Sequence, residues 1–200
     1  MTAALGAAGM LAAKAQVYSV NAVGYINLDL KAGFSLIANQ LNNGDNTLNT
    51  VLTGAANGTT VYKYNGTGYD ISTFLFGQWS PNLTLKPGEG AFINLAAATK
   101  FTLVGEVPQG TAAAPLTQNV PAGFSIQSSQ VPQSAALAGA NGLNFPGANG
   151  DTVYFFRDGA YVISTFLFGD FSPAAVPAVG ESFFVNKGTA ATWTRVFSVN

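Results

Sequence analysis

The chain has 200 residues, a formal net charge of −1 and no Cys or His, and only 8% of its residues are charged. This balance excludes a basic surface that would attract nucleic acid or anionic lipid. The missing Cys and His exclude disulfides, thiol nucleophiles, the usual zinc ligands and the commonest general base, so we expect neither a cofactor nor enzymatic activity.

The N-terminus predicts export. Residues 2–13 are small and apolar, and Ala13-Lys14-Ala15 precedes Gln16. An A-x-A pattern after an apolar stretch is typical of a signal-peptide cleavage site. We interpret residues 1–15 as a signal-peptide remnant and expect a secreted bacterial protein, extracellular or on the cell surface. The alternative is an ordinary Ala-rich helix. No other segment has the roughly eighteen apolar residues that a membrane-spanning helix needs.

The rest of the chain is a tandem repeat. Residues 60–104 and 152–196 align without a gap and are identical at roughly twenty of forty-five positions. The alignment contains an unbroken identity, Ile-Ser-Thr-Phe-Leu-Phe-Gly, at residues 71–77 and 163–169. The repeat therefore predicts two modules of equal topology.

The boundary between the modules is expected where the sequence is rich in breakers. Residues 108–115 contain Pro and Gly and no large apolar residue. We therefore assign residues 16–107 to the first β module and residues 108–200 to the second.

The first elements of each module read as strands and short turns. Residues 17–30 predict a long strand that is broken or bulged at Gly24. Residues 34–38 form a short apolar run that predicts a buried strand. One helical turn is expected at residues 47–52, and its counterpart at residues 134–137, with Ser134 as N-cap.

A hairpin follows in each module. Asn65-Gly66 joins the strands expected at residues 61–64 and 69–71, and Asp158-Gly159 takes the same place in the second module. Both dipeptides supply the positive φ that tight hairpin turns need. The turn chemistry is thus retained although the side chains differ.

The last predicted elements are a turn and two strands. Lys86-Pro87-Gly88-Glu89 predicts a type II turn before a strand at residues 91–95, and the second module keeps Gly180-Glu181 before its strand at residues 183–185. The final strands are expected at residues 99–104 and 192–196.

The repeated heptapeptide supplies the strongest aromatic signal. We expect Phe74, Phe76, Phe166 and Phe168 to form a core where the two modules meet, because aromatic side chains contribute large buried apolar areas. The alternative is an aromatic surface that stacks on sugar rings or docks a partner.

Two other polar features have structural interpretations. Glu89 and Glu181 are equivalent carboxylates that each follow a turn glycine, where a carboxylate accepts backbone N–H bonds and holds the loop. The oxygen-rich loop at residues 42–46 lacks the spacing of a calcium-binding loop, so we interpret it as a solvated turn.

Motifs from most of the mature chain resemble a β module of secreted and surface proteins of environmental bacteria. These motifs are a Gly-Phe-Ser-Leu-Ile strand at residues 33–37, a Tyr-x-Tyr-Asn-Gly hairpin at residues 62–66, and a Pro-Gly-Glu-Gly turn at residues 87–90. The second module departs from the pattern at residues 127–129 and at Val179. The resemblance implies export and a β fold, and it implies no activity and no site residues.

Together these features predict an all-β protein of two tandem antiparallel β-sandwich or open-barrel modules related by a pseudo-twofold, with short helical turns. The expected function is non-enzymatic, with a structural or adhesive role outside the cell. The expected partners are a polysaccharide, a cell-envelope component or further copies of the chain, with no nucleic acid and no membrane span.

Two alternatives remain open. A carbohydrate-binding module would expose a row of aromatic rings beside Asn or Asp side chains. The candidate ligand-binding residues are Tyr62, Tyr64, Tyr69, Trp79 and Tyr161. A glycosidase-like enzyme would instead need Glu89 or Glu181 in a cleft with a second acid nearby.

Overall fold

The computed structural model describes residues 22–139 and 141–199. The predicted signal peptide lies outside the described residues, as do residues 17–21 of the first predicted strand. The described chain is almost entirely strands and turns, with one turn of helix, α1 (Leu48–Val51), at the position expected from the sequence. In these described ranges, no helix is long and apolar enough to cross a membrane.

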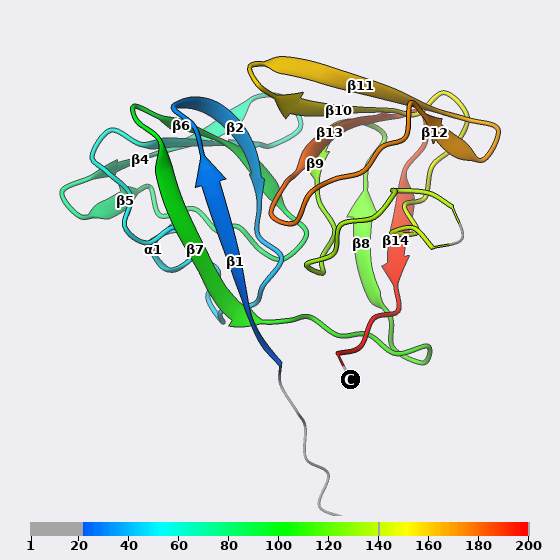
Figure 1. Cartoon of the computed structure of the whole chain (residues 1–200), viewed down its shortest axis with the longest axis horizontal. Helices are drawn as coiled ribbons and strands as arrows, with labels where there is room; N and C mark the ends of the chain where they lie inside the picture. Colours follow the sequence, from blue (N-terminus) through cyan, green and yellow to red (C-terminus); the bar gives the residue numbers. More distant parts are fainter. Residues whose placement is uncertain (1–21, 140, 200) are drawn as a thin grey trace, which may run out of the picture.

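Two antiparallel sheets build the first module (Figure 1). One sheet has five strands in the order β2-β6-β3-β4-β5, and the other pairs β1 with β7. The strands are β1 (Val23–Leu30), β2 (Gly33–Ala38), β3 (Thr60–Tyr64), β4 (Tyr69–Leu75), β5 (Gln78–Ser80), β6 (Gly90–Leu95) and β7 (Thr99–Glu106).

The second module repeats this topology. Its five-stranded sheet has the order β12-β11-β10-β13-β9, and β14 pairs with β8. The strands are β8 (Leu116–Val120), β9 (Gly123–Gln127), β10 (Thr152–Arg157), β11 (Ala160–Leu167), β12 (Asp170–Ser172), β13 (Phe183–Lys187) and β14 (Ala191–Arg195). The predicted fold class, an all-β protein of two tandem antiparallel modules, is confirmed.

Each module has its own core between its two sheets. In the first module, Phe101 of β7 and Ile93 of β6 are buried in one cluster. In the second, Trp193 of β14 packs against Phe183 of β13, with ring centroids 6.4 Å apart. Because side chains alternate between the two faces of a strand, the opposite, outer face of each five-stranded sheet is left for other contacts.

The expectation of a bulge at Gly24 is wrong. Strand β1 is continuous, and Gly24 pairs with Gly105 of β7 in regular register. A Cβ on Gly24 would lie 2.8 Å from the Leu41 side chain and 2.9 Å from that of Val107. Glycine is therefore required here by close packing rather than by an irregular backbone.

The second helical turn is also absent at the predicted place. Residues 134–137 form no helix, and the Ser134 hydroxyl donates to the carbonyl of Pro177, 2.9 Å away, instead of capping one. The tertiary contact with the loop before β13 therefore overrides the local capping signal.

The predicted turns at Asp158-Gly159 and at residues 86–89 are confirmed, but the one at Asn65-Gly66 is not. The four residues 65–68 join β3 to β4, only Gly66 of the dipeptide has a positive φ, and the Asn65 side chain accepts the N–H groups of Thr67 and Gly68. At the β10–β11 hairpin, Asp158 and Gly159 have φ values of 51° and 80°, as a type I′ turn requires. Gly88 has a φ of 92°, and the Glu89 N–H donates to the Lys86 carbonyl at 2.9 Å, as expected for a type II turn.

A fully buried ion pair distinguishes the second module from the first. Lys187 Nζ contacts the Asp151 carboxylate, and their side chains are 1% and 2% exposed. Lys187 also donates to the Pro146 carbonyl at 2.6 Å. The carboxylate accepts the backbone N–H groups of Ala148 and Gly188, at 2.8 and 3.0 Å. The pair is thus satisfied within a small polar network.

The first module fills the same positions with Thr59 and Leu95, which are also buried. The equivalence rests on the backbone, because the Phe74 N–H donates to the Thr59 carbonyl as the Phe166 N–H donates to that of Asp151. The duplication therefore supplies an uncharged counterpart of the ion pair.

We predict that Asp151→Thr alone will lower the free energy of unfolding by about 3–5 kcal/mol, because it leaves the Lys187 ammonium buried without its partner. The double variant Asp151→Thr/Lys187→Leu, which copies the first module, should regain most of this loss. Urea unfolding followed by circular dichroism measures both. A double variant no more stable than the single one would contradict the prediction.

The same pair predicts a pH dependence. Burial by itself raises the pKa of Asp151, but hydrogen bonds from Lys187 and from the N–H groups of Gly188 and Ala148 outweigh burial and hold the pKa below 3.8. A lowered folded-state pKa stabilises the fold above the unfolded value, and this stabilisation is lost as the pH falls. Between about pH 5 and about pH 3, wild type should therefore lose more unfolding free energy than the double variant.

Candidate binding face and inter-module clefts

The modules meet through the outer faces of their five-stranded sheets. Leu36 and Phe92 of the first module pack with Ile126 and Phe184 of the second, and all four side chains are buried. The rings of Phe92 and Phe184, which are equivalent residues, lie 5.9 Å apart. Equivalent residues that contact each other across an interface indicate a twofold relation.

Ring contacts across this interface are reciprocal. Tyr64 lies 5.5 Å from Phe184, and the equivalent pair, Phe156 and Phe92, lies 5.4 Å apart. We call the connected rings of this interface the aromatic cluster. Its members are Phe34, Tyr62, Tyr64, Tyr69 and Phe92 with their equivalents Phe124, Tyr154, Phe156, Tyr161 and Phe184.

Backbone hydrogen bonds follow the same symmetry. The Ala38 N–H donates to the Gly180 carbonyl at 2.8 Å, and the equivalent Ser128 N–H donates to the Gly88 carbonyl at 2.9 Å. The modules are therefore fixed by reciprocal side-chain and main-chain contacts and act as one unit.

Four of the five predicted ligand-binding residues lie in the aromatic cluster. Tyr69 and Tyr161 are 42% and 50% exposed, whereas Tyr62 and Tyr64 are partly buried beside them. Tyr69 has its pKa raised above 10, first by burial and then by electrostatic repulsion from Tyr161 and Tyr64. The two exposed tyrosines belong to different modules and are linked through the rings that cross the interface between the modules, which we call the seam.

Trp79 does not belong to this surface. Its side chain is 2% exposed in the core of the first module, and its indole N–H donates to the Leu52 carbonyl. Alternation along β5 directs Trp79 inward, opposite to Gln78 and Ser80. The structure therefore removes Trp79 from the candidate ligand-binding set.

The sequence did not single out most of the cluster's phenylalanines. The available signal was that β10 and β13 are apolar on both faces, as in Tyr154-Phe155-Phe156 and Phe183-Phe184-Val185. A strand that is apolar on both faces is typical of burial on both sides. That signal indicates a covered outer face but not what covers it.

The outer face beyond the seam is apolar and nearly uncharged. Strand register places only one charged residue, Asp170, on this face in the two described five-stranded sheets. Exposed apolar surface of this kind marks an interaction site. Large apolar side chains on it that are exposed by roughly half are Phe34, Tyr69, Ile71, Leu75, Phe124, Tyr161, Ile163 and Leu167.

The expected role of the repeated heptapeptide is wrong. Phe74 and Phe166 pack inside their own modules, against Trp79 and Phe171. Phe76 and Phe168 are 93% and 96% exposed at the tips of two hairpins. Alternation sends the first phenylalanine of each pair to the core, and the second falls in a turn that belongs to neither face.

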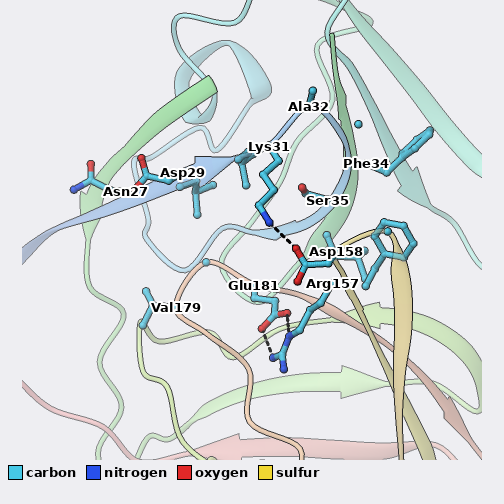
Figure 2. Close-up of a pocket in the computed structure, with 17 residues that line it drawn as sticks. Asn27, Asp29, Lys31, Ala32, Phe34, Ser35, Arg157, Asp158, Val179 and Glu181 are labelled. Carbon is cyan, nitrogen blue, oxygen red and sulfur yellow. Dashed lines mark hydrogen bonds and ion pairs between the residues drawn. The ribbon is translucent and has the colours of Figure 1, made fainter. Parts of the chain in front are cut away.

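Two clefts lie between the modules at equivalent places. The first cleft, of about 830 Å³, is bounded by β1 and β2 on one side and by the β10–β11 turn on the other (Figure 2). The second cleft, of about 420 Å³, lies at the equivalent β8, β9 and β3–β4 positions. Phe34 lines the first cleft and Phe124 lines the second, so both clefts open beside the aromatic cluster.

The first cleft is rich in charge, but its charges are paired. Lys31 Nζ lies 2.6 Å from the Asp158 carboxylate, and Arg157 binds Glu181 through two hydrogen bonds of 2.7 and 2.6 Å (Figure 2). In the second cleft, Asn65 replaces Arg157. The duplicated site has therefore kept its place in the fold, while its size and its chemistry diverged.

The acids in these clefts hold structure. Glu181 accepts the Ala178 N–H at 2.8 Å besides both bonds from Arg157. Glu89 accepts the equivalent Lys86 N–H at 2.7 Å and the Lys63 ammonium at 2.8 Å. The prediction that both carboxylates bind loop N–H groups is confirmed.

Glu181 does share its cleft with a second acid, Asp158, as the glycosidase alternative requires. The hydrogen bond from Lys31 and its positive charge lower the pKa of Asp158. A glycosidase acid needs the opposite shift. Asp29, a third acid of this cleft, lies 3.2 Å from Lys100, so each carboxylate in the cleft has a cationic partner.

The oxygen-rich loop directs its side chains to its own backbone. The side-chain Oδ1 of Asn42 accepts the Gly44 N–H at 3.1 Å, and the side-chain Oδ1 of Asn43 accepts the Asn46 N–H at 2.8 Å. Among the residues that the structure describes, no group of three or more acidic side chains could hold a metal ion.

Comparison with protein-family models, with curated proteins and with solved structures found no match for this chain. The resemblance to secreted bacterial β modules therefore stays a prediction.

We predict that Gly90→Ala will destabilise the interface by about 1–3 kcal/mol, because its Cβ would lie 2.2 Å from Ser182 Cβ and 2.7 Å from Ile126. Gly90 and Ser182 are equivalent positions at the pseudo-twofold. The exchange Gly90→Ser/Ser182→Gly should therefore restore most of the stability lost in Gly90→Ser alone, as measured by urea unfolding.

Gly68→Ala is the matched control, because a Cβ there meets nothing within 4 Å. It should change the free energy of unfolding little. Equal effects of Gly68→Ala and Gly90→Ala would contradict the importance of this contact.

Proposed function

We propose that this chain is an exported, non-enzymatic adhesive protein that binds an uncharged polysaccharide through the outer sheet face at the seam. The observation that carries the proposal is that two exposed tyrosines from different modules, Tyr69 and Tyr161, belong to one connected set of aromatic rings on this face. This proposal joins the adhesive role expected from the sequence with its carbohydrate-binding alternative.

The chemistry of the face favours a sugar polymer. Aromatic rings present apolar faces on which the C–H groups of a pyranose ring pack, and a phenol adds a hydrogen-bonding edge. Asn94 and Asn186 lie on the same face, in equivalent positions, and their amides match sugar hydroxyls. With Asp170 as the face's one charged residue in the described sheets, a neutral polymer fits better than an acidic one.

Two further features support a binding role without catalysis. Glu89 and Glu181 are engaged by backbone N–H groups and by cationic side chains. The chain contains no His or Cys to act as a nucleophile or base near neutral pH. Export follows from the sequence of residues 2–15 and fits a protein that meets a polysaccharide outside the cell.

The test is a pull-down with insoluble neutral polysaccharides, cellulose and chitin, together with affinity electrophoresis in soluble β-glucans. The double variant Tyr69→Ala/Tyr161→Ala should bind on the order of tenfold to a hundredfold more weakly, since each ring contributes about 0.5–1.5 kcal/mol. Tyr25→Ala is the matched control, because Tyr25 is 70% exposed on β1, outside the seam.

The control should bind like wild type. The proposal fails if folded wild type binds none of these polymers, or if the control loses as much affinity as the double variant.

A further inference from the structure

The two ends of the molecule carry the same exposed phenylalanine. The β4–β5 hairpin turns at Phe76-Gly77, with φ values of 53° and 86°, and the β11–β12 hairpin turns at Phe168-Gly169, with φ values of 54° and 96°. The two phenylalanine side chains are 93% and 96% exposed. Within the described residues, no large hydrophobic side chain is more exposed.

Local folding does not favour phenylalanine here. A bulky residue in the left-handed region costs on the order of 1 kcal/mol or more. Two-residue hairpin turns prefer Asn-Gly or Asp-Gly, and this chain uses Asp158-Gly159 at its neighbouring hairpin. Both modules nevertheless have Phe-Gly, inside their longest identical segment. The strain and exposure indicate a role for these rings outside the fold.

Each ring is presented on an anchored turn. The Phe76 N–H donates to the Asn57 side chain at 3.1 Å, and the Phe168 N–H donates to the equivalent Asn149 at 2.9 Å. A turn held in one conformation loses little entropy when it binds. In the first module the backbone edge beside the turn is also less available, because the Trp79 N–H already donates to the Asn49 side chain at 2.8 Å. The tips are thus suited to side-chain contacts.

The tips lie at opposite ends of the longest axis of the molecule, beside β5 and β12 (Figure 1). Two tips that lie this far apart in opposite directions do not enter one planar membrane together. They are suited instead to joining two neighbours, one at each end.

We propose that copies of this chain join end to end through the Phe76 and Phe168 tips. The two tips have the same sequence and the same turn geometry, so a tip that packs on another tip forms a contact related by a twofold. Because each copy has one tip at each end, such contacts generate an open chain instead of a closed dimer. The net charge of −1 leaves little long-range repulsion between copies. This inference does not depend on polysaccharide binding.

Sedimentation velocity over a range of concentrations tests it with three variants: Phe76→Asn, Phe168→Asn and both together. Asn accepts the left-handed conformation, so urea unfolding should show the variants to be at least as stable as wild type. Wild type should form oligomers whose mean mass rises steadily with concentration. Each single variant keeps one tip and should stop at the dimer, and the double variant should be monomeric.

Tyr25→Asn, which removes another exposed ring, should assemble like wild type. The proposal is overturned if wild type is monomeric at every concentration, or if the double variant assembles as wild type does. Polysaccharide pull-down of the double variant should be unchanged, which separates this inference from the proposed function.

Discussion

The packing of two equivalent sheets on each other governs the structure. Phe92 and Phe184 face each other across the pseudo-twofold, and the cross-module pairs Tyr64–Phe184 and Phe156–Phe92 repeat the same contact in both directions. Because aromatic pairs stabilise beyond the area they bury, reciprocal placement doubles each favourable contact. The same packing determines which rings are covered and which stay at the surface. The exposed tyrosines and both clefts thus follow from how the modules dock.

The few charged residues of the chain are distributed unevenly over the structure. Its ionic groups are concentrated where they fix loops, as in the Arg157–Glu181 and Lys63–Glu89 pairs. Apart from Asp170, the outer face carries aromatic, aliphatic and uncharged polar side chains. Such a face gains little from electrostatic steering, so the polysaccharide binding that we propose there would depend on shape and apolar contact.

Comparison of the two modules separates the features that both share from those that differ. Strand order, the Phe-Gly turns and the loop-holding acids are the same in both. The core position filled by an ion pair in one module is filled by Thr59 and Leu95 in the other, and Arg157 of the larger cleft is replaced by Asn65 in the smaller one. The backbone accommodates both sets because Lys187 and Asp151 satisfy each other and nearby backbone groups, whereas Leu95 needs no polar partner. The strained phenylalanine turns were not exchanged in either copy.

The sequence alone determined the all-β class, the duplication, the turns at Asp158-Gly159 and at residues 86–89, and the binding of loop N–H groups by Glu89 and Glu181, because each depends on local chemistry or on internal identity. It also named four of the five tyrosines of the aromatic cluster and missed Tyr154. Only the tertiary structure decided that Trp79 is core, that Phe76 and Phe168 are exposed at opposite ends, and that no helix forms at Ser134. The physical reason is that periodicity assigns a residue to one face of a strand, whereas what covers that face depends on the docking of a second module far away in the chain.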